Sequence, residues 1–369
     1  MKRSFAGFAR NFGRIDRKKG SFVAALGLGG LLFGASQQHF HPSFLQPWRV
    51  EHPPAPANKC DVKIARKIVS PVDQSGLGLR LYQYQSCPFC SKVRAFLDYY
   101  GFSYEVVEVH PVTKREIKFS LSNKVPLLVL RGCSNEELTD SSLIVSILGT
   151  FLLDPSQKIK QLLSFYPKEE QKDSKGKVVV SSPNKYYLMF GDSLKSQSLI
   201  DKCSREREWR RWVDEHFIHM ISPNTNRTFS ESLDSFRWFS EVGDWHNHYS
   251  TLMRLSAVYL GAVAMYFVAK RIKNRYNLKE DVRESLYDAC NQWLQAKGAD
   301  NRFMGGAEPN LADLSLYGTI TSFEGCQAFS DMMNNTEMGP WFQAVQETVT
   351  SHQGANEFAI KLDKVNSSA

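Results

Sequence analysis

The chain has 369 residues, of which 42% are hydrophobic and 23% are charged, a composition typical of a globular protein long enough for two domains. The net charge of +8 is concentrated at the start, because residues 1–20 carry seven basic side chains and one acid, which leaves +2 for the remaining 349 residues. A nearly neutral folded part argues against a nucleic-acid-binding surface. Seven widely spaced cysteines argue against a disulfide-held secreted scaffold and favour a reducing compartment.

The first 60 residues are expected to form a leader. At helical spacing the apolar side chains from Phe5 to Ile15 share one face and the arginines lie on the other, as in a mitochondrial transit peptide or a helix on a membrane surface. The apolar run 22–35 is shorter than the ~20 residues that cross a bilayer, so an anchor, a signal core and part of a processed leader all stay open. The proline-rich segment 42–57 indicates a linker.

Residues 75–153 alternate between strand and helix patterns, which predicts an α/β domain. Strands are expected at 79–84, 104–109 and 125–130, and helices at 91–100, 111–120 and 143–153. Gly101 has the position of a C-terminal helix glycine, and Asp140 with Ser141 or Ser142 has the position of a cap. The order of these elements is that of a thioredoxin-like domain.

The sequence CPFC, residues 87–90, lies at the junction between the first strand and its helix. Unpaired N–H groups and the positive end of the helix dipole stabilise a thiolate there, so Cys87 is the expected nucleophile. Cys90 lies one turn inside the helix and would resolve a mixed disulfide if one forms, and its role stays open. A structural pair is the alternative, and zinc is disfavoured because the sequence has no second CxxC and no HxxxH.

The second half of the chain follows a helical pattern. Residues 154–200 indicate a connector with one hairpin at 177–190, and residues 201–355 indicate an all-α domain. Helices are expected at 205–221, ended by Ser222–Pro223, and at 255–276, 279–294 and 309–318. The apolar run in 255–276 fits the buried central helix of such a domain better than a membrane span.

The first half resembles the glutaredoxin branch of the thioredoxin superfamily, whose motif is CP[YF]C. The resemblance carries over to Val125–Pro126, which the family holds in the cis form beside the cysteinyl part of glutathione. It also carries over to Asp140 and Ser141, at a helix start that receives the γ-glutamyl carboxylate and amine. Together with Phe89 of the motif, these residues are the glutathione site that the resemblance implies.

One helix of the second half begins with Asn310 and Asp313 in capping positions. This arrangement is similar to the capping motif in the helical domain of glutathione transferases. The stretches EWRRWVDEHFIHMISPN, YLGAVAMYFVAKRIK and FMGGAEPNLADLSLYG, joined to the CPFC half, resemble the type 2 family of membrane-associated prostaglandin E synthases. The resemblance implies α/β plus all-α architecture, with a thioredoxin/glutaredoxin-like domain followed by a glutathione-transferase-like helical domain. It also implies isomerisation of prostaglandin H2 to prostaglandin E2.

In that reaction a thiolate attacks one oxygen of the weak peroxide bond, and loss of a proton from the carbon bearing that oxygen yields the ketone and returns the thiolate. Cys87 and the sulfur of glutathione are both candidates for the attack. Tyr84 is either a hydrogen-bond donor to the thiolate or the substrate, or a core tyrosine. A glutaredoxin-type disulfide reductase that uses Cys90, and a non-enzymatic protein that binds glutathione and haem, are the alternatives.

The resemblance also implies a haem-bound form that degrades prostaglandin H2, with the iron ligated through the glutathione thiolate. The candidate haem contacts are His216, His219, Ser222, Arg271 and Arg275. Without the resemblance, the histidines are partly buried helix residues and the arginines a solvated basic face.

The expected surroundings of the protein follow from the same resemblance and from the leader. We expect attachment to a membrane through the N-terminal segment, and a homodimer because the superfamily is commonly dimeric. The expected location is the Golgi membrane, with a processed soluble form in the cytoplasm and the mitochondrion as the alternative.

Overall fold

The computed structural model describes residues 49–51, 62–111, 113–172, 178–190 and 197–355, all within the compact unit Phe44–Ala369. The amphipathic segment and the apolar run of the expected leader lie outside the described residues, as does Cys60. Within the expected linker 42–57, Arg49–Glu51 form a strand, so the linker prediction is wrong at this point. These three residues form a strand because their main chain pairs antiparallel with Lys67, Ile68 and Val69 of the next strand.

A six-stranded mixed sheet forms the first half of the described fold. Its order is β1-β2-β4-β3-β5-β6, in which β3 and β4 are parallel and the other neighbours are antiparallel. The strands are β1 Arg49–Glu51, β2 Arg66–Val69, β3 Leu79–Gln83, β4 Tyr104–Glu108, β5 Leu127–Leu130 and β6 Glu136–Thr139. The four strands β4-β3-β5-β6 form the thioredoxin-like core, and the apolar runs of β3, β4 and β5 agree with the three predicted strands.

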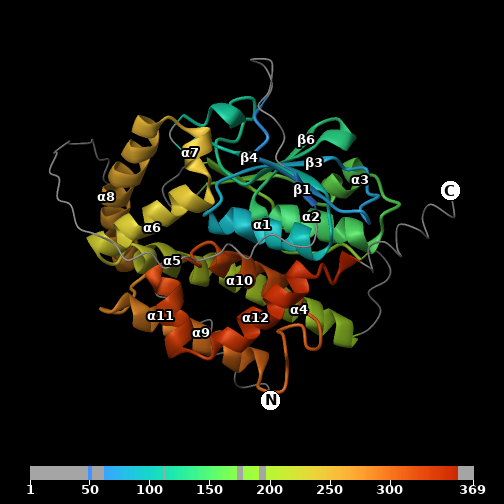
Figure 1. Cartoon of the computed structure of the whole chain (residues 1–369). Helices are drawn as coiled ribbons and strands as arrows, with labels where there is room; N and C mark the ends of the chain where they lie inside the picture. The colour runs from blue at the N-terminus through green and yellow to red at the C-terminus, as the bar shows by residue number, and fades with distance from the viewer. Residues whose placement is uncertain (1–48, 52–61, 112, 173–177, 191–196, 356–369) are drawn as a thin grey trace. The chain divides into compact units, whose positions relative to one another are not determined.

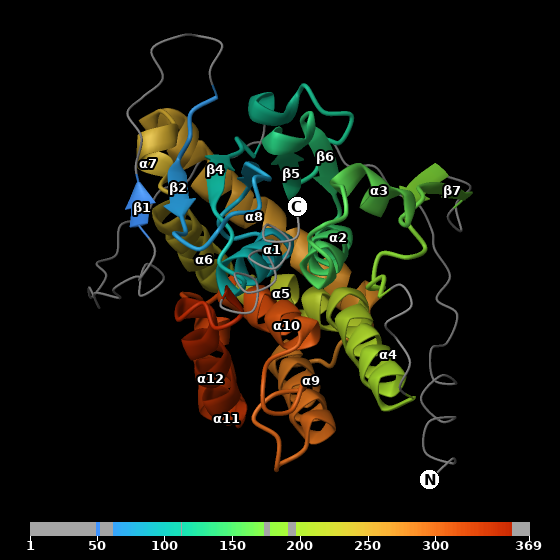
Figure 2. The ribbon, with the colours of Figure 1, turned by 90° about the vertical axis from the view of Figure 1, so that its right-hand side faces the viewer.

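Two helices, α1 (Pro88–Tyr99) and α2 (Ser141–Leu153), lie between the sheet and the helical half (Figures 1 and 2). Helix α1 ends where Gly101 adopts a φ of +67°, as predicted, and the Gly101 N–H donates to the Asp98 carbonyl at 3.1 Å. The other face of α1 packs on α10 (Leu311–Thr321). A Cβ at Gly318 would lie 2.6 Å from Lys92 Cα, so the two helices approach at backbone distance.

The described part of the second half consists mainly of helices, several of which enclose a core of buried aromatic side chains. They are α4 Gln197–Trp212, a π-helical turn Val213–Phe217, α5 Ile218–Thr225, α6 Phe229–Val242, α7 Trp245–His248, α8 Thr251–Arg275, α9 Val282–Lys297, α10, α11 Gln327–Asn335 and α12 Met338–Thr350. Trp293 is fully buried between Trp209 and Trp341, with ring centroids 5.4 Å apart in both pairs. The predicted capping box of Asn310 and Asp313 is confirmed, and Asp313 also accepts a hydrogen bond from the Trp341 indole at 2.9 Å.

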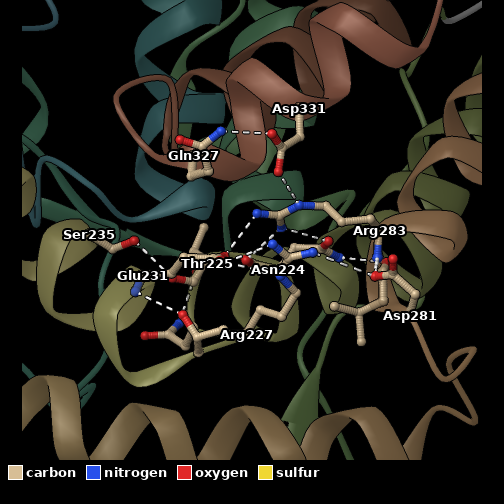
Figure 3. A network of polar contacts seen from close by, with 12 residues as sticks. Asn224, Thr225, Arg227, Glu231, Ser235, Asp281, Arg283, Gln327 and Asp331 are labelled. Carbon is tan, nitrogen blue, oxygen red and sulfur yellow. Dashed lines mark hydrogen bonds and ion pairs between the residues drawn. The ribbon is translucent and has the colours of Figure 1, made fainter.

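One buried arginine ties four of these helices together (Figure 3). The Arg283 guanidinium of α9 donates to the main-chain and side-chain oxygens of Asn224 in α5, at 2.7 and 2.9 Å. It also forms ion pairs with Glu231 of α6 at 2.9 Å and with Asp331 of α11 at 2.7 Å. Because every branch of the guanidinium is matched, the buried charge is compensated.

Helix α8 differs from the sequence expectation. Only Val258, Ala262 and Ala269 of its 25 residues are buried, so the prediction of a buried central helix is wrong. Its inner side packs on α6, where the Ser232 hydroxyl donates to the Ala262 carbonyl at 2.8 Å, while Leu260 and Phe267 are 56% and 64% exposed. Within the described part of the chain, α8 is the helix long and apolar enough to cross a membrane, with 17% of that window buried.

Three smaller expectations also differ from the structure. In the region 111–120 the described residues form only a short 3-10 turn, Arg115–Ile117, because Lys114 has a φ of +46° that interrupts a helix. The hairpin of the connector pairs β7 Glu169–Lys172 with β8 Val178–Ser181, one strand earlier than expected, after the short α3 Ile159–Ser164.

The helix expected to end at Ser222–Pro223 instead continues through Pro223 to Thr225. The carbonyls of this last turn have side-chain donors, since Asn224 Nδ2 donates to the Met220 carbonyl at 2.9 Å and Thr225 Oγ1 to the Ile221 carbonyl at 3.1 Å. Pro223 lacks the N–H that would donate to the His219 carbonyl, and these side-chain donors add hydrogen bonds to the next two carbonyls of the turn.

Candidate active site

Cys87 lies at the junction of β3 and α1, where it is the N-cap residue with an extended backbone (φ −83°, ψ 121°). Pro88 takes the first helical position, where no N–H is needed. The Cys87 N–H donates to the Tyr84 carbonyl at 3.1 Å, and the Cys87 carbonyl accepts from the Ser91 N–H at 2.9 Å. The thiol is therefore carried on a fixed backbone at the positive end of α1.

The two cysteines of the motif are free thiols with opposite electrostatic environments. A hydrogen bond from the Cys90 thiol lowers the pKa of Cys87, and the main-chain N–H groups of Cys90 and Phe89 and the charge of Arg94 act in the same direction. Burial and the neighbouring Cys87 sulfur raise the pKa of Cys90 well above its ordinary value. Cys87 is partly exposed and Cys90 is fully buried. Cys87 is thus the thiol of lower pKa in the pair, which is the property that a nucleophilic thiol needs, and Cys90 is its hydrogen-bond donor.

Tyr84 and Phe89 lie on either side of Cys87 in the sequence. Burial, followed by the charges of Cys87 and Cys90, raises the pKa of Tyr84 to about 12. The phenol is therefore close to both sulfurs and stays protonated at neutral pH. The Phe89 side chain is 38% exposed beside the thiol.

A polar network that the sequence analysis missed fixes the loop that leads to Cys87. The Arg94 guanidinium donates to the Gln85 carbonyl at 2.8 Å and to the Gln83 side-chain oxygen at 2.5 Å. The Gln85 side-chain oxygen accepts from Arg66 at 2.5 Å and from Gln83 at 2.9 Å, and Glu108 pairs with Arg66 at 2.9 Å. The sequence signal for this network is the alternation of Gln83 and Gln85 with tyrosines in the β-prone run 82–85.

The residues expected to contact glutathione lie at two loop ends of the thioredoxin-like half. The peptide bond between Val125 and Pro126 is cis, as the resemblance implies. Asp140 caps α2, and its Oδ1 accepts from the N–H groups of Ser142 at 2.9 Å and Leu143 at 3.4 Å. Asp140 is exposed and has a φ of +73°, a conformation that costs energy for a residue other than glycine and that recurs at functional sites. Ser141, the next residue, is buried.

The residues expected to contact haem come from the π-helical turn, α5 and α8. The His219 ring stacks on Tyr276 with centroids 4.0 Å apart, and His216 lies against Trp212 at 5.4 Å. Burial lowers the pKa of both histidines, and the nearby charge of Arg275 lowers that of His219 further, so both are neutral at pH 7.

Ser222 and Arg271 complete this group. The Ser222 hydroxyl oxygen is buried with no hydrogen-bond partner among the residues described. Arg271 is exposed on α8, one turn before Arg275. The structure therefore brings His216, His219 and Arg275 together. Within the described ranges, no cluster of three or more His, Cys, Asp or Glu side chains has the closeness that a metal ion needs.

Comparison with known proteins agrees with this geometry. Residues 81–150 match the family described as glutathione S-transferase, N-terminal domain. Prostaglandin E synthase 2 of Danio rerio is 44% identical over 278 residues, which cover 75% of this chain and 72% of that protein. Prostaglandin E synthase 2 of Mus musculus is 42% identical over 299 residues, which cover 79% and 77%.

Two solved glutathione transferases show a more distant likeness. One is glutathione S-transferase III in apo form, with 16% identity and a TM-score of 0.39 over 74% of this chain and 96% of that chain. Another is rice GST1 in complex with glutathione, with 12% identity and a TM-score of 0.39 over 78% and 98%.

The strand order, the thiol at the start of α1 and the matched N-terminal domain define a glutathione-transferase-like protein with a thioredoxin fold and a following helical domain. Its relatives narrow this class, and the chain belongs to the prostaglandin E synthase 2 family of enzymes. The resemblance found in the sequence is confirmed.

Proposed function

We propose that this chain converts prostaglandin H2 into prostaglandin E2 with the Cys87 thiolate as the nucleophile. The observation that carries the proposal is the thiol pair, in which Cys90 donates to Cys87 and lowers its pKa. The name of the relatives, prostaglandin E synthase 2, supports the choice of substrate. A thiolate is a strong nucleophile toward the weak O–O bond of an endoperoxide.

The proposed reaction returns every group to its starting state. The Cys87 thiolate attacks one peroxide oxygen, so that an S–O bond forms while the O–O bond breaks, and Tyr84 donates its proton to the released oxygen. The Tyr84 phenolate then removes the proton from the carbon that bears the sulfur-bound oxygen. The C–H electron pair becomes the carbonyl bond, the S–O bond breaks and the thiolate returns. No net electrons are consumed, so the reaction is an isomerisation.

We further propose that glutathione binds between Cys87 and the start of α2. The start of α2, where Asp140 accepts from the N–H groups of Ser142 and Leu143 and keeps an exposed side chain, suits an α-amino acid end, and the main chain at Val125, beside the cis bond to Pro126, suits a peptide. These groups fit glutathione, which would supply a second thiol at the site. Val125, Pro126, Asp140 and Ser141 would hold it.

We also propose that haem binds near the neutral histidines. The unpartnered hydroxyl of Ser222, the His219 ring and the Arg275 guanidinium are donors that fit carboxylates such as the propionates. His216 and the exposed Arg271 would complete the contacts. When bound, the iron would supply the chemistry that degrades prostaglandin H2 instead of isomerising it.

The exposed row on α8 supports the proposal that two chains form a homodimer. Leu260, Val263 and Phe267 lie on this row, and a 25-residue helix without an acidic side chain is largely uncovered. Phe267→Lys should convert a dimer to a monomer in light scattering, whereas Leu121→Lys, at an exposed leucine in a loop, should not. A monomeric wild-type chain would contradict the homodimer.

Membrane attachment through the N-terminal segment is proposed as well, at the Golgi, with a processed soluble form in the cytoplasm and the mitochondrion as the alternative. Vesicle flotation compares the full chain with a chain that starts at residue 62. Only the full chain should float if the N-terminal segment is the anchor, and flotation of both would assign the contact to another surface such as α8.

Product analysis on prostaglandin H2 tests the function. Cys87→Ser should abolish formation of prostaglandin E2, while Cys90→Ser, which keeps a hydrogen-bond donor, should preserve it. Cys133→Ser is the matched control, since Cys133 lies outside the site. Loss of activity with Cys90→Ser alone would favour a disulfide reductase. If neither haem-free nor haem-loaded protein converts prostaglandin H2, the proposed function is wrong.

A further inference from the structure

The carboxylate of Asp214 is the meeting point of four segments that are distant in the sequence. It is mostly buried, with 10% of its side chain exposed, and pairs with the fully buried Lys92 of α1 at 2.6 Å. Its second oxygen accepts from the Ser142 hydroxyl of α2 at 2.5 Å and from the Tyr186 hydroxyl of the connector at 3.1 Å. Lys92 also donates to the Ser142 hydroxyl at 2.7 Å. One residue of the helical half thus contacts α1, α2 and the connector together.

A second buried cation holds the same turn of α2 from the main-chain side. Arg210, one turn before Asp214, donates to the Ser142 carbonyl at 3.1 Å and to the Ser146 hydroxyl at 2.7 Å. It also donates to the Tyr186 carbonyl at 3.1 Å. The hydroxyl, the carbonyl and the N–H of Ser142 are all engaged, the last by Asp140. The start of α2 is therefore fixed from several directions.

Asp214 lies in the π-helical turn, which has one residue more per turn than the α-helices before and after it. The extra residue rotates everything after it by about 100° relative to an uninterrupted helix. The turn therefore fixes the orientation of Asp214 relative to His219 in α5, and that orientation differs from the one in an uninterrupted α-helix. Asp214 and His219 remain close enough for the carboxylate to act on the pKa of the histidine.

We propose that Asp214 and Lys92 are positioning residues that set the distance between the thiol and the start of α2. The inference rests on the proposed binding of glutathione between these two ends. Lys92 lies in the helix that begins at Cys87, and Ser142 lies in the turn that would bind the γ-glutamyl group. Both are held by one carboxylate, so the spacing between the two ends of the glutathione site is determined from the helical half.

The charges of the pair support a fixed contact. Burial acts to raise the pKa of Asp214, but the charge and hydrogen bond of Lys92, with the hydroxyl of Ser142, outweigh it and hold that pKa below its ordinary value. Such a buried pair adds little net stability compared with apolar residues of similar size. A role in geometry accounts for its presence at this location better than a role in stability.

The test compares glutathione affinity, thiol reactivity and melting temperature in the full chain. Asp214→Asn should weaken glutathione binding by about tenfold, which is the effect of losing one hydrogen bond to a charged group from the contacts that hold the site. The alkylation rate of Cys87 by iodoacetamide should not change, since Cys87 keeps its own local donors. Ser142→Ala should weaken glutathione binding in the same way with less effect on folding.

The control is Asp331→Asn, which breaks an ion pair of the buried Arg283 in the helical half (Figure 3). It should lower the melting temperature and leave glutathione affinity unchanged. The double variant Lys92→Met with Asp214→Leu removes both charges, so it should recover the melting temperature but not the affinity.

Two results would overturn the inference in distinguishable ways. If the wild-type chain binds glutathione and Asp214→Asn and Ser142→Ala bind it equally well, the positioning role is wrong and the proposed function stands. If the wild-type chain binds no glutathione, the proposed glutathione site and this inference fail together. If the double variant recovers the affinity for glutathione, the contact between Lys92 and Asp214 is purely structural.

Discussion

Replacing Cys90 by alanine tests the electrostatics of the thiol pair directly. In the structure, the Cys90 thiol donates a hydrogen bond to the Cys87 sulfur, and this is the largest of the causes that act on the pKa of Cys87. Cys90→Ala removes the donor, whereas Cys90→Ser replaces it by a hydroxyl. We therefore expect the pKa of Cys87 to rise in the alanine variant and to change little in the serine variant.

The size of the effect follows from the strength of the bond. A hydrogen bond to a charged group contributes about 1.5–3 kcal/mol, and about 1.4 kcal/mol corresponds to one pKa unit. Cys87 is partly exposed, so water replaces part of the lost bond. We expect the alkylation rate of the alanine variant to be about tenfold lower at every pH below both pKa values.

The assay is the pH dependence of iodoacetamide alkylation, measured on the peptide that contains Cys87 by mass spectrometry. Cys290→Ala is the matched control, because Cys290 is a buried thiol outside the site. An alanine variant whose alkylation profile overlays the wild-type profile would refute the role of Cys90. Equal shifts in the alanine and serine variants would show that shape, and not the donor, matters.

Two further predictions concern folding. Gly318→Ala should lower the free energy of unfolding by about 1–3 kcal/mol, because the new Cβ would meet the backbone of Ser91 and Lys92 at 2.6 Å; Gly339→Ala, with nothing within 4 Å, should not destabilise the protein in the same urea titration. Burial raises the pKa of Glu324 to about 7 from an ordinary 4.5, so its contribution to stability is present below pH 4.5 and is lost as the pH rises through 7. At pH 8, Glu324→Gln should therefore be more stable than the wild type by up to about 3 kcal/mol in the free energy of unfolding, and it should melt at a higher temperature. At pH 4 the two proteins should melt at the same temperature. Equal melting temperatures at pH 8 would contradict this prediction.

Local patterns were enough to predict three of the four strands of the thioredoxin-like core, and β6 was missed. Strands β3, β4 and β5 carry runs of apolar β-prone residues, and Gly101 and Asp140 mark the helix ends within a few residues of where they occur. Strand β2 was missed because RKIV has two basic residues and pairs only along an edge of the core. Its main chain pairs with β4 on one side and β1 on the other, which a single sequence does not reveal.

The wrong prediction for α8 has a specific physical cause. An apolar run of this length predicts removal from water, but the pattern does not say which surface covers it. The sequence analysis assumed that the rest of the chain covers it, whereas only one side of the helix packs on α6 and α5. The apolar run looks the same in the sequence whether the protein's own core covers it or a surface outside the described chain does.

In the candidate site, too, the local features could be predicted from the sequence and the long-range contacts could not. The electrostatic environment of Cys87 is local, because the helix start, the Cys90 donor and Arg94 all lie within eight residues of it, and the CPFC motif was sufficient to identify the thiol whose pKa is lowered. The contacts of Asp214 join residues 72 and 122 positions apart, and no local pattern marks them. Lys92 looks like an ordinary helix lysine until its partner is known. The thioredoxin-like half alone would keep the thiol chemistry, but Lys92 and Ser142 would lose the carboxylate that holds them together. Because that carboxylate belongs to the helical half, this half is part of the architecture of the site and not only a cover for α1.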